Sequence, residues 1–212
     1  MTSLKFQKPF DWTSILDLSM PKTVPGKQVI NFFSTDKDYR NNPESIAFVK
    51  KYLANAREFD IDAMVLRYAC EQACIDGEFL EMGVCTGRTI NFIAALNPEK
   101  IIYGFDSFTG MPEDWQGRDD LPVTKGMFAN KDPEQLPPVL HNVRLLKGLF
   151  KETLPQFSAQ LLKNKPIAFL HIDCDIYGST KDVFINLSNN IVAGTIILFD
   201  ELVFPEACLG SL

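Results

Sequence analysis

The spacing of hydrophobic positions changes at about residue 78 of the chain. Between residues 43 and 77, apolar side chains recur every three or four positions, which is the period of an amphipathic helix. Beyond residue 78, short apolar runs alternate with helical segments, and each run is apolar at successive positions, as in strands buried on both faces. The pattern predicts a helical N-terminal segment followed by an α/β domain.

Two helices are predicted in the N-terminal segment. The first begins at Asn42-Pro43-Glu44, because Asn caps a helix, Pro suits its first turn and Glu favours its positive end. The second begins at Asp60 or Asp62 and ends at Gly77. Residues 1–40 show no clear period and are predicted to form an irregular arm. We therefore divide the chain into an arm with helices on the substrate side, residues 1–76, and an α/β domain, residues 77–212.

Five strands alternate with helices in the predicted α/β domain. The strands are predicted at residues 79–82, 100–105, 142–147, 167–172 and 195–199, and the helices at 89–96, 152–162 and 180–191. This alternation produces parallel strands covered on both sides, so the predicted fold class is α/β with a doubly wound, mainly parallel sheet. Residues 106–131 are rich in Gly, Pro and Asp, which predicts a long functional loop or a lid.

Composition and charge narrow the function classes. The chain has 46% hydrophobic residues and a net charge of −6, without a dominant run of Lys or Arg, which argues against nucleic acid as the main partner. No apolar stretch reaches the roughly 18 residues that span a bilayer, so no membrane partner is expected. The first residues lack the pattern of a secretory signal, and the five scattered cysteines fit a reduced, cytoplasmic chain.

The turn after the first strand is a candidate ligand site, because doubly wound sheets bind ligands at the carboxyl ends of their strands. Its sequence is Glu81-Met-Gly-Val-Cys-Thr-Gly87, in which the glycines let a ligand approach the backbone beside a helix N-terminus. The Gly-x-x-x-Gly spacing differs from the dinucleotide fingerprint and so disfavours a nucleotide-dependent oxidoreductase. A purely structural tight turn stays an alternative for this motif.

The next two strand ends indicate a nucleoside. Asp106, followed by Ser107-Phe108, comes roughly 20 residues after the glycine turn, where a carboxylate suits a ribose diol; a helix cap or loop acid is the alternative. Gly148-Leu149-Phe150 follows the third strand and would flank an adenine ring or pack under the loop. Because no phosphate-cradling loop is present, S-adenosylmethionine is the favoured ligand, with Glu81 near its amino-acid end.

Four carboxylates follow the last two predicted strands. Asp173 and Asp175 come after residues 167–172, and Asp200 and Glu201 come after residues 195–199. Acids are seldom buried unless they are paired or bound to a cation, and Mg²⁺ prefers oxygen ligands. Such an ion would lower the pKa of a hydroxyl on an acceptor with adjacent hydroxyls, and a carboxylate outside the metal shell would take the proton. Helix caps and loop acids on a polar rim are the alternative.

Five segments of the chain, in this order, resemble the macrocin O-methyltransferase family. They are Phe79-Leu-Glu-Met-Gly-Val-Cys-Thr-Gly87, Gly104-Phe-Asp-Ser-Phe-Thr-Gly-Met-Pro112, Gly148-Leu-Phe-Lys-Glu-Thr-Leu154, His171-Ile-Asp-Cys-Asp-Ile-Tyr177 and Phe199-Asp-Glu201. The resemblance implies a class I, Rossmann-like enzyme that uses S-adenosylmethionine and Mg²⁺ to methylate sugar hydroxyls in natural product biosynthesis.

The resemblance also implies roles for individual residues. Asp173, Asp200 and Glu201 would hold the metal, and Asp175 would be the general base. The residues expected to bind the cofactor are Glu81, Gly83, Thr86, Gly87, Asp106, Ser107, Phe108, Gly148, Leu149, Phe150 and Asp173.

Class I methyltransferases usually have two further strands after the fifth, but only residues 202–212 follow Glu201. We therefore expect a sheet without its last two strands. Either the sequence is truncated, or the edge of the sheet is covered by the N-terminal arm or by a second copy of the chain in a homo-oligomer. Two functions stay open. One is a metal-assisted O-methyltransferase acting on a sugar or another small vicinal-diol metabolite. The other is a non-catalytic or truncated S-adenosylmethionine-binding protein.

Overall fold

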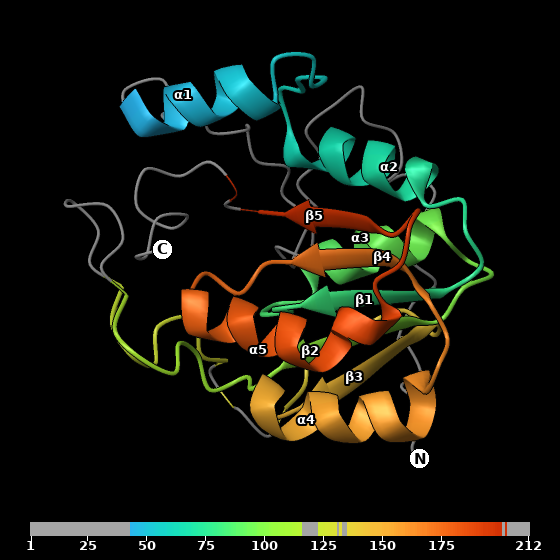
Figure 1. Cartoon of the computed structure of the whole chain (residues 1–212). Coiled ribbons are helices and arrows are strands. Elements are labelled where there is room, and N and C mark those ends of the chain that lie inside the picture. Colours follow the sequence, from blue (N-terminus) through green and yellow to red (C-terminus); the bar gives the residue numbers. More distant parts are fainter. Residues whose placement is uncertain (1–42, 116–122, 131, 133–134, 201, 203–212) are drawn as a thin grey trace, which may run out of the picture.

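The computed structural model describes residues 43–115, 123–130, 132, 135–200 and 202 (Figure 1). The helices are α1 (Pro43–Tyr52), α2 (Asp62–Gln72), α3 (Arg88–Leu96), α4 (Phe150–Phe157) and α5 (Tyr177–Leu187), with a π-helical turn at Ser158–Leu162 and a 3-10 turn at Ser188–Asn190. The strands are β1 (Glu78–Met82), β2 (Ile102–Asp106), β3 (Val143–Lys147), β4 (Ile167–Ile172) and β5 (Ile196–Phe199). Each predicted strand and helix is present within a few residues of its predicted bounds. The predicted arm at residues 1–40 and the strands expected to be missing after Glu201 lie outside the described residues.

The five described strands form one parallel sheet in the order β3-β2-β1-β4-β5. From β1 the chain moves outward to β2 and β3, and it then returns to the other side of β1 for β4 and β5. The strand order therefore reverses between β1 and β4, which is where open α/β sheets bind their ligands. The predicted doubly wound fold class is confirmed.

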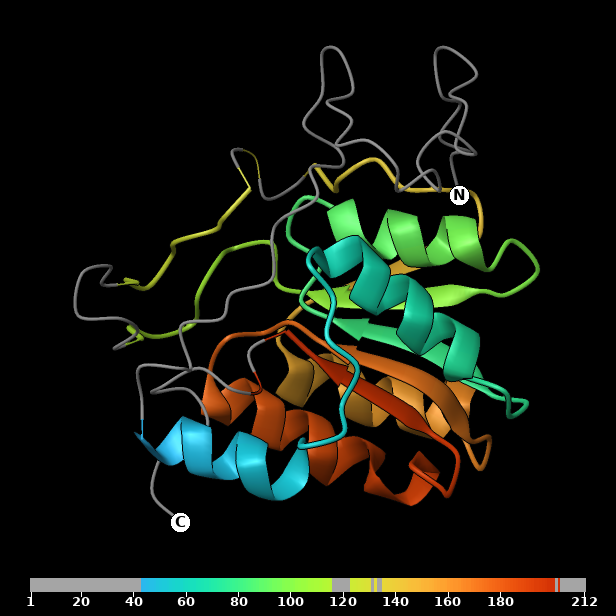
Figure 2. The ribbon, with the colours of Figure 1, turned by 90° about the horizontal axis from the view of Figure 1, so that it is seen from above.

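Helices cover both faces of the sheet, with α2 and α3 on one face and α4 and α5 on the other (Figures 1 and 2). Each face has its own hydrophobic core. Phe79 of β1 and Phe169 of β4 stack in the core under α2 and α3, with ring centroids 5.5 Å apart. Leu80 and Leu170, the next residues along each strand, belong to the core under α4 and α5. Alternate residues of a strand thus face alternate helix layers.

Helix α2 packs into the same core as the sheet. Its buried residues Ala63, Leu66, Ala69 and Cys70 belong to the cluster that contains Phe79. The boundary at residue 76 stays a prediction, although α2 is part of the layer that covers the sheet. Among the residues that the structure describes, no helix is both long and apolar enough to cross a membrane.

The buried side chain of Asn142 joins the end of α3 to the start of β3. Its Nδ2 atom lies 3.0 Å from the carbonyl oxygen of Ala94 and 3.1 Å from those of Asn97 and Lys100. Asn142 fixes the position of the α3–β2 turn relative to β3, because its main-chain carbonyl also accepts a hydrogen bond from Ile102 N–H at the start of β2.

We expect Asn142→Ala to lower the free energy of unfolding by about 1–3 kcal/mol, because it removes a buried amide donor that three main-chain carbonyl oxygens share. Urea unfolding measures this change. Asn189→Ala, at an exposed position, is the matched control and should have little effect. Equal losses in the two variants would contradict the assigned role of Asn142.

Candidate active site at the carboxyl end of the sheet

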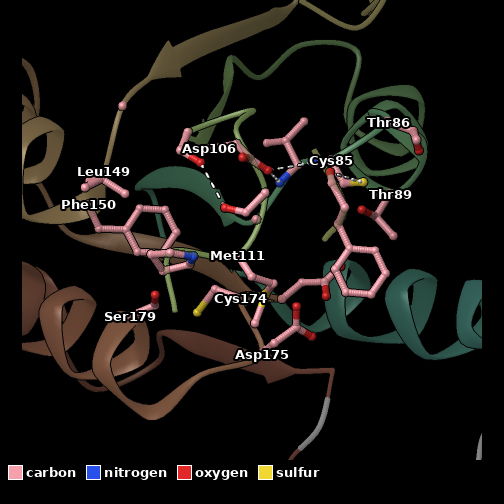
Figure 3. Close-up of a pocket in the computed structure, with 18 of the residues that line it drawn as sticks. Cys85, Thr86, Thr89, Asp106, Met111, Leu149, Phe150, Cys174, Asp175 and Ser179 are labelled. Carbon is pink, nitrogen blue, oxygen red and sulfur yellow. Dashed lines mark hydrogen bonds between the residues drawn. The ribbon is translucent and has the colours of Figure 1, made fainter. Parts of the chain in front are cut away.

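A cavity of about 420 Å³ opens at the carboxyl ends of β1, β2, β3 and β4 (Figure 3). Leu149 and Phe150 lie on one side of it and Thr86 and Thr89 on the other, with Asp175 between the two sides. The volume is in the range of small-molecule and cofactor sites. The lining residues are Gly83, Val84, Cys85, Thr86, Arg88, Thr89, Asp106, Ser107, Gly110, Met111, Pro112, Phe128, Gly148, Leu149, Phe150, Asp173, Cys174, Asp175 and Ser179.

Gly83 is required where the ends of β1 and β4 meet. Its φ angle is +94°, and a Cβ atom at this position would lie 1.6 Å from the carbonyl oxygen of Asp173. Gly83 N–H donates to the Phe105 carbonyl, and Asp173 N–H donates to the Met82 carbonyl. Only glycine fits this backbone approach, so the turn that follows β1 lies directly against the acids that follow β4.

Asp106 holds the glycine turn through its carboxylate. Oδ2 accepts hydrogen bonds from Val84 N–H at 2.8 Å and Cys85 N–H at 2.7 Å, and Oδ1 accepts one from Phe108 N–H at 2.7 Å. Asp106 also lines the cavity. A ribose bound here would have to share the two oxygens with these backbone donors.

Of the residues expected to bind the cofactor, some line the cavity and others lie behind it. Those lining it are Gly83, Thr86, Asp106, Ser107, Gly148, Leu149, Phe150 and Asp173. Glu81 is fully buried beneath it, Gly87 caps the start of α3 with a φ of +82°, and Phe108 is buried in the core. These three are not lining residues, because β1 turns Glu81 toward the helix layer and the other two serve the local fold.

Three side chains that can ligate a metal converge beside the cavity. His171, Asp173 and Asp200 each present a ligand atom, and these atoms lie within 4.8 Å of one another. Asp173 and Asp200 belong to the predicted metal set, and Glu201 lies outside the described residues. Imidazole nitrogen and carboxylate oxygen are both ordinary ligands of divalent cations, so the donor set fits such an ion.

Asp173, Asp175 and His171 carry perturbed pKa values. Burial and the nearby charge of Asp200 raise the pKa of Asp173 well above its ordinary value. Burial, followed by the charges of Asp200 and Asp106, raises the pKa of Asp175 to about 6. Burial alone would lower the pKa of His171, but the hydrogen bond and charge of Glu81 raise it to about 9. Crowded carboxylates of this kind favour the binding of a cation.

Backbone strain gathers at the cavity. Of the five described non-glycine residues with positive φ, Cys85, Phe128 and Asp175 line it. Their φ angles are +47°, +66° and +60°. Such conformations cost on the order of 1–3 kcal/mol each and cluster at functional sites.

The fold brings to the site several residues that were given no role from the sequence. Met111, Pro112 and Phe128 come from the loop predicted to be functional, but none of them was assigned a role, although Met111 and Pro112 belong to a segment that resembles the family. His171 was not assigned a role, yet strand alternation places it on the same side of β4 as Asp173. A role for His171 can be recognised only when the strand order is known, because the order places His171 beside Glu81 of β1.

Comparison with known proteins gives the family. A family model described as macrocin-O-methyltransferase (TylF) matches residues 63–211, which is 149 of the 212 residues. The chain belongs to the macrocin O-methyltransferase family. The resemblance expected from the five segments is thereby confirmed, and the family model and the curated relative are both described as O-methyltransferases.

One curated relative of this family member comes from Streptomyces olivaceus. It is 8-demethyl-8-(2,3-dimethoxy-alpha-L-rhamnosyl)-tetracenomycin-C 4'-O-methyltransferase, and it is 28% identical over 165 residues. The match covers 68% of this chain and 60% of the relative's own length.

Two solved structures share the fold of this family member. The crystal structure of CalS11, a calicheamicin methyltransferase, has a TM-score of 0.59 at 23% identity and covers 88% of this chain and 86% of its own. The apo structure of CalS11, described as a TDP-rhamnose 3'-O-methyltransferase, has a TM-score of 0.50 at 24% identity and covers 81% and 76%. The likeness supports a Rossmann-like methyltransferase fold.

We expect Asp106→Asn to loosen the glycine turn. An asparagine has one acceptor oxygen in place of two, so at least one of the three backbone N–H groups loses its acceptor. Hydrogen exchange should become faster at one or more of the Val84, Cys85 and Phe108 amides, as measured by exchange mass spectrometry or NMR. Asp76→Asn, at a fully exposed side chain, is the control. Unchanged exchange at all three amides in Asp106→Asn would show that the carboxylate does not hold the turn.

Proposed function

We propose that the protein is an S-adenosylmethionine-dependent, divalent-metal-assisted O-methyltransferase that acts on a hydroxyl of a sugar or another small vicinal-diol metabolite. The observation that carries the proposal is the cavity at the strand switch point, with Asp173 and Asp175 in its wall, in a member of this family. Methyl transfer needs both the cavity and the acids, because the cofactor must lie next to a group that removes the proton from the acceptor hydroxyl.

The cavity offers each part of S-adenosylmethionine a suitable surface. Gly83 and the start of α3 present backbone to the methionine portion, and Asp106 and Ser107 lie where a ribose would hydrogen-bond. Leu149 and Phe150 provide an apolar wall for the adenine ring. The glycine turn leaves its first N–H groups to Asp106, which suits a ligand without phosphates.

Asp175 is the residue that we assign as general base. It lines the cavity, its backbone is held in a left-handed turn, and its pKa of about 6 leaves it mostly ionised at neutral pH. When bound, the cofactor would supply the methyl group and a divalent cation would make the acceptor hydroxyl more acidic. Asp175 would take the hydroxyl proton, and Asp173, Asp200 and Glu201 would hold the cation.

A sugar acceptor is proposed from the family and from the relatives, whose names refer to rhamnose-containing substrates. A sugar has the adjacent hydroxyls that were expected of the acceptor from the carboxylates at the last two strand ends. We further propose that residues 1–76 lie on the acceptor side of the site and that the enzyme is cytoplasmic. Coverage of the β5 edge by a second copy of the chain also stays a proposal.

The proposal predicts that Asp175→Asn binds S-adenosylmethionine but loses at least about 100-fold in kcat, the usual contribution of a general base. Calorimetry measures cofactor binding with and without Mg²⁺, and turnover is measured on a panel of sugars and other vicinal diols. Asp182→Asn, on α5 and outside the cavity lining, is the matched control and should keep its activity.

Three outcomes distinguish the functions. Retained turnover in Asp175→Asn would overturn its role as base. Cofactor binding by the wild type without turnover on any diol would favour the non-catalytic S-adenosylmethionine-binding protein. Absence of cofactor binding would contradict both functions.

Cysteine labelling tests the position of the cofactor independently. Cys85 and Cys174 line the cavity, whereas Cys74 is exposed at the far end of α2 and Cys70 is buried with a pKa raised to about 12. We expect S-adenosylmethionine to slow the alkylation of Cys85 and Cys174 and to leave the alkylation rate of Cys74 unchanged. Cys70 should be unreactive with and without the ligand. Mass spectrometry of the labelled peptides gives the rates, and equal labelling of Cys85 with and without ligand would place the cofactor elsewhere.

A further inference from the structure

A buried hydrogen-bond chain runs from α3 to the metal-ligating group. Thr89 Oγ1 donates to Glu81 Oε1 at 2.8 Å, and Glu81 Oε2 lies 3.2 Å from His171 Nδ1. Glu81 and His171 are directly paired residues of β1 and β4, and their side chains are 0% and 1% exposed. A carboxylate buried this deeply fixes the orientation of the imidazole that it contacts.

Two acids lie close to the imidazole of His171. Asp173 directly follows β4 and is two residues beyond His171, and its N–H still donates to the Met82 carbonyl of β1, so the two side chains leave the chain on the same side. Asp200 joins them because its N–H donates to the Ile172 carbonyl at the end of the adjacent strand. The ligand atoms of the three side chains lie within 4.8 Å of one another.

We infer that His171 is a direct ligand of the divalent cation, with Glu81 as the outer carboxylate that orients the ring. With Nδ1 bonded to Glu81, Nε2 is the nitrogen that remains for a cation. A ligating histidine almost always bonds a carboxylate or carbonyl through its second ring nitrogen, and Glu81 supplies that partner here.

This inference rests on the metal site of the proposed function, and it changes the metal that the site would prefer. Asp173, Asp200 and Glu201 alone would form an oxygen site suited to Mg²⁺. A nitrogen ligand favours first-row transition ions, whose affinity rises from Mn²⁺ through Co²⁺ to Ni²⁺. We therefore expect Ni²⁺ and Co²⁺ to displace Mg²⁺, in the presence or absence of S-adenosylmethionine.

The deciding measurement is pulsed electron paramagnetic resonance of the full chain loaded with one equivalent of Mn²⁺. The expected result is the nitrogen coupling of a directly bound imidazole, which His171→Gln removes. The matched control is His141→Gln, because His141 is the second of the two histidines and is exposed. Glu81→Gln should keep the nitrogen coupling but weaken Mn²⁺ binding about 10- to 100-fold in calorimetry.

Each outcome decides the inference. Nitrogen coupling in the wild type supports it even if His171→Gln does not fold. Bound Mn²⁺ without nitrogen coupling would overturn it, because His171 would then be only a structural partner of Glu81, and the proposed methyltransferase would stand with oxygen ligands. Absence of Mn²⁺ binding would also overturn it, together with the metal part of the proposed function, while cofactor binding is tested separately by calorimetry with S-adenosylmethionine.

Discussion

The buried contact between Glu81 and His171 is the constraint on which the candidate site depends. The two residues are paired in register on β1 and β4, at the point where the strand order reverses. Removing one partner of a buried charged pair typically costs about 3–5 kcal/mol, because the other charge is left uncompensated. The contact therefore ties the two strands together and keeps Asp173, two residues beyond His171, at the cavity.

The turns that follow the strands give the cavity its shape. Gly83 allows the end of β1 to approach the carbonyl of Asp173, and Asp106 holds the backbone of the same turn from the β2 side. Cys85 and Asp175 keep left-handed conformations at opposite sides of this arrangement. The hydrogen bonds of the surrounding strands offset this strain, so the site is preorganised on the rigid part of the fold.

Family membership and local chemistry lead to the same interpretation of the acids. Methyl transfer to a hydroxyl needs a base and a means of making the hydroxyl acidic, and carboxylates with raised pKa values at a strand switch point suit both tasks. The inferred nitrogen ligand adds a reason for burying Glu81. In this interpretation, the charge of Glu81 acts on the metal through His171.

Much of the fold followed from the sequence alone, because hydrophobic period and turn residues are local properties. They determined the five strands, the helices between them, and the placement of Asp106, Asp173, Asp175 and Asp200 at strand ends. The strand order and the pairing of Glu81 with His171 were decided by the tertiary structure, since these residues are 90 positions apart and meet only when β4 pairs with β1. From the sequence, Glu81 was predicted to lie near the amino-acid end of the cofactor, and the fold buries its side chain against an imidazole. A local pattern shows that a polar residue lies in a strand, but only packing decides which partner compensates its charge.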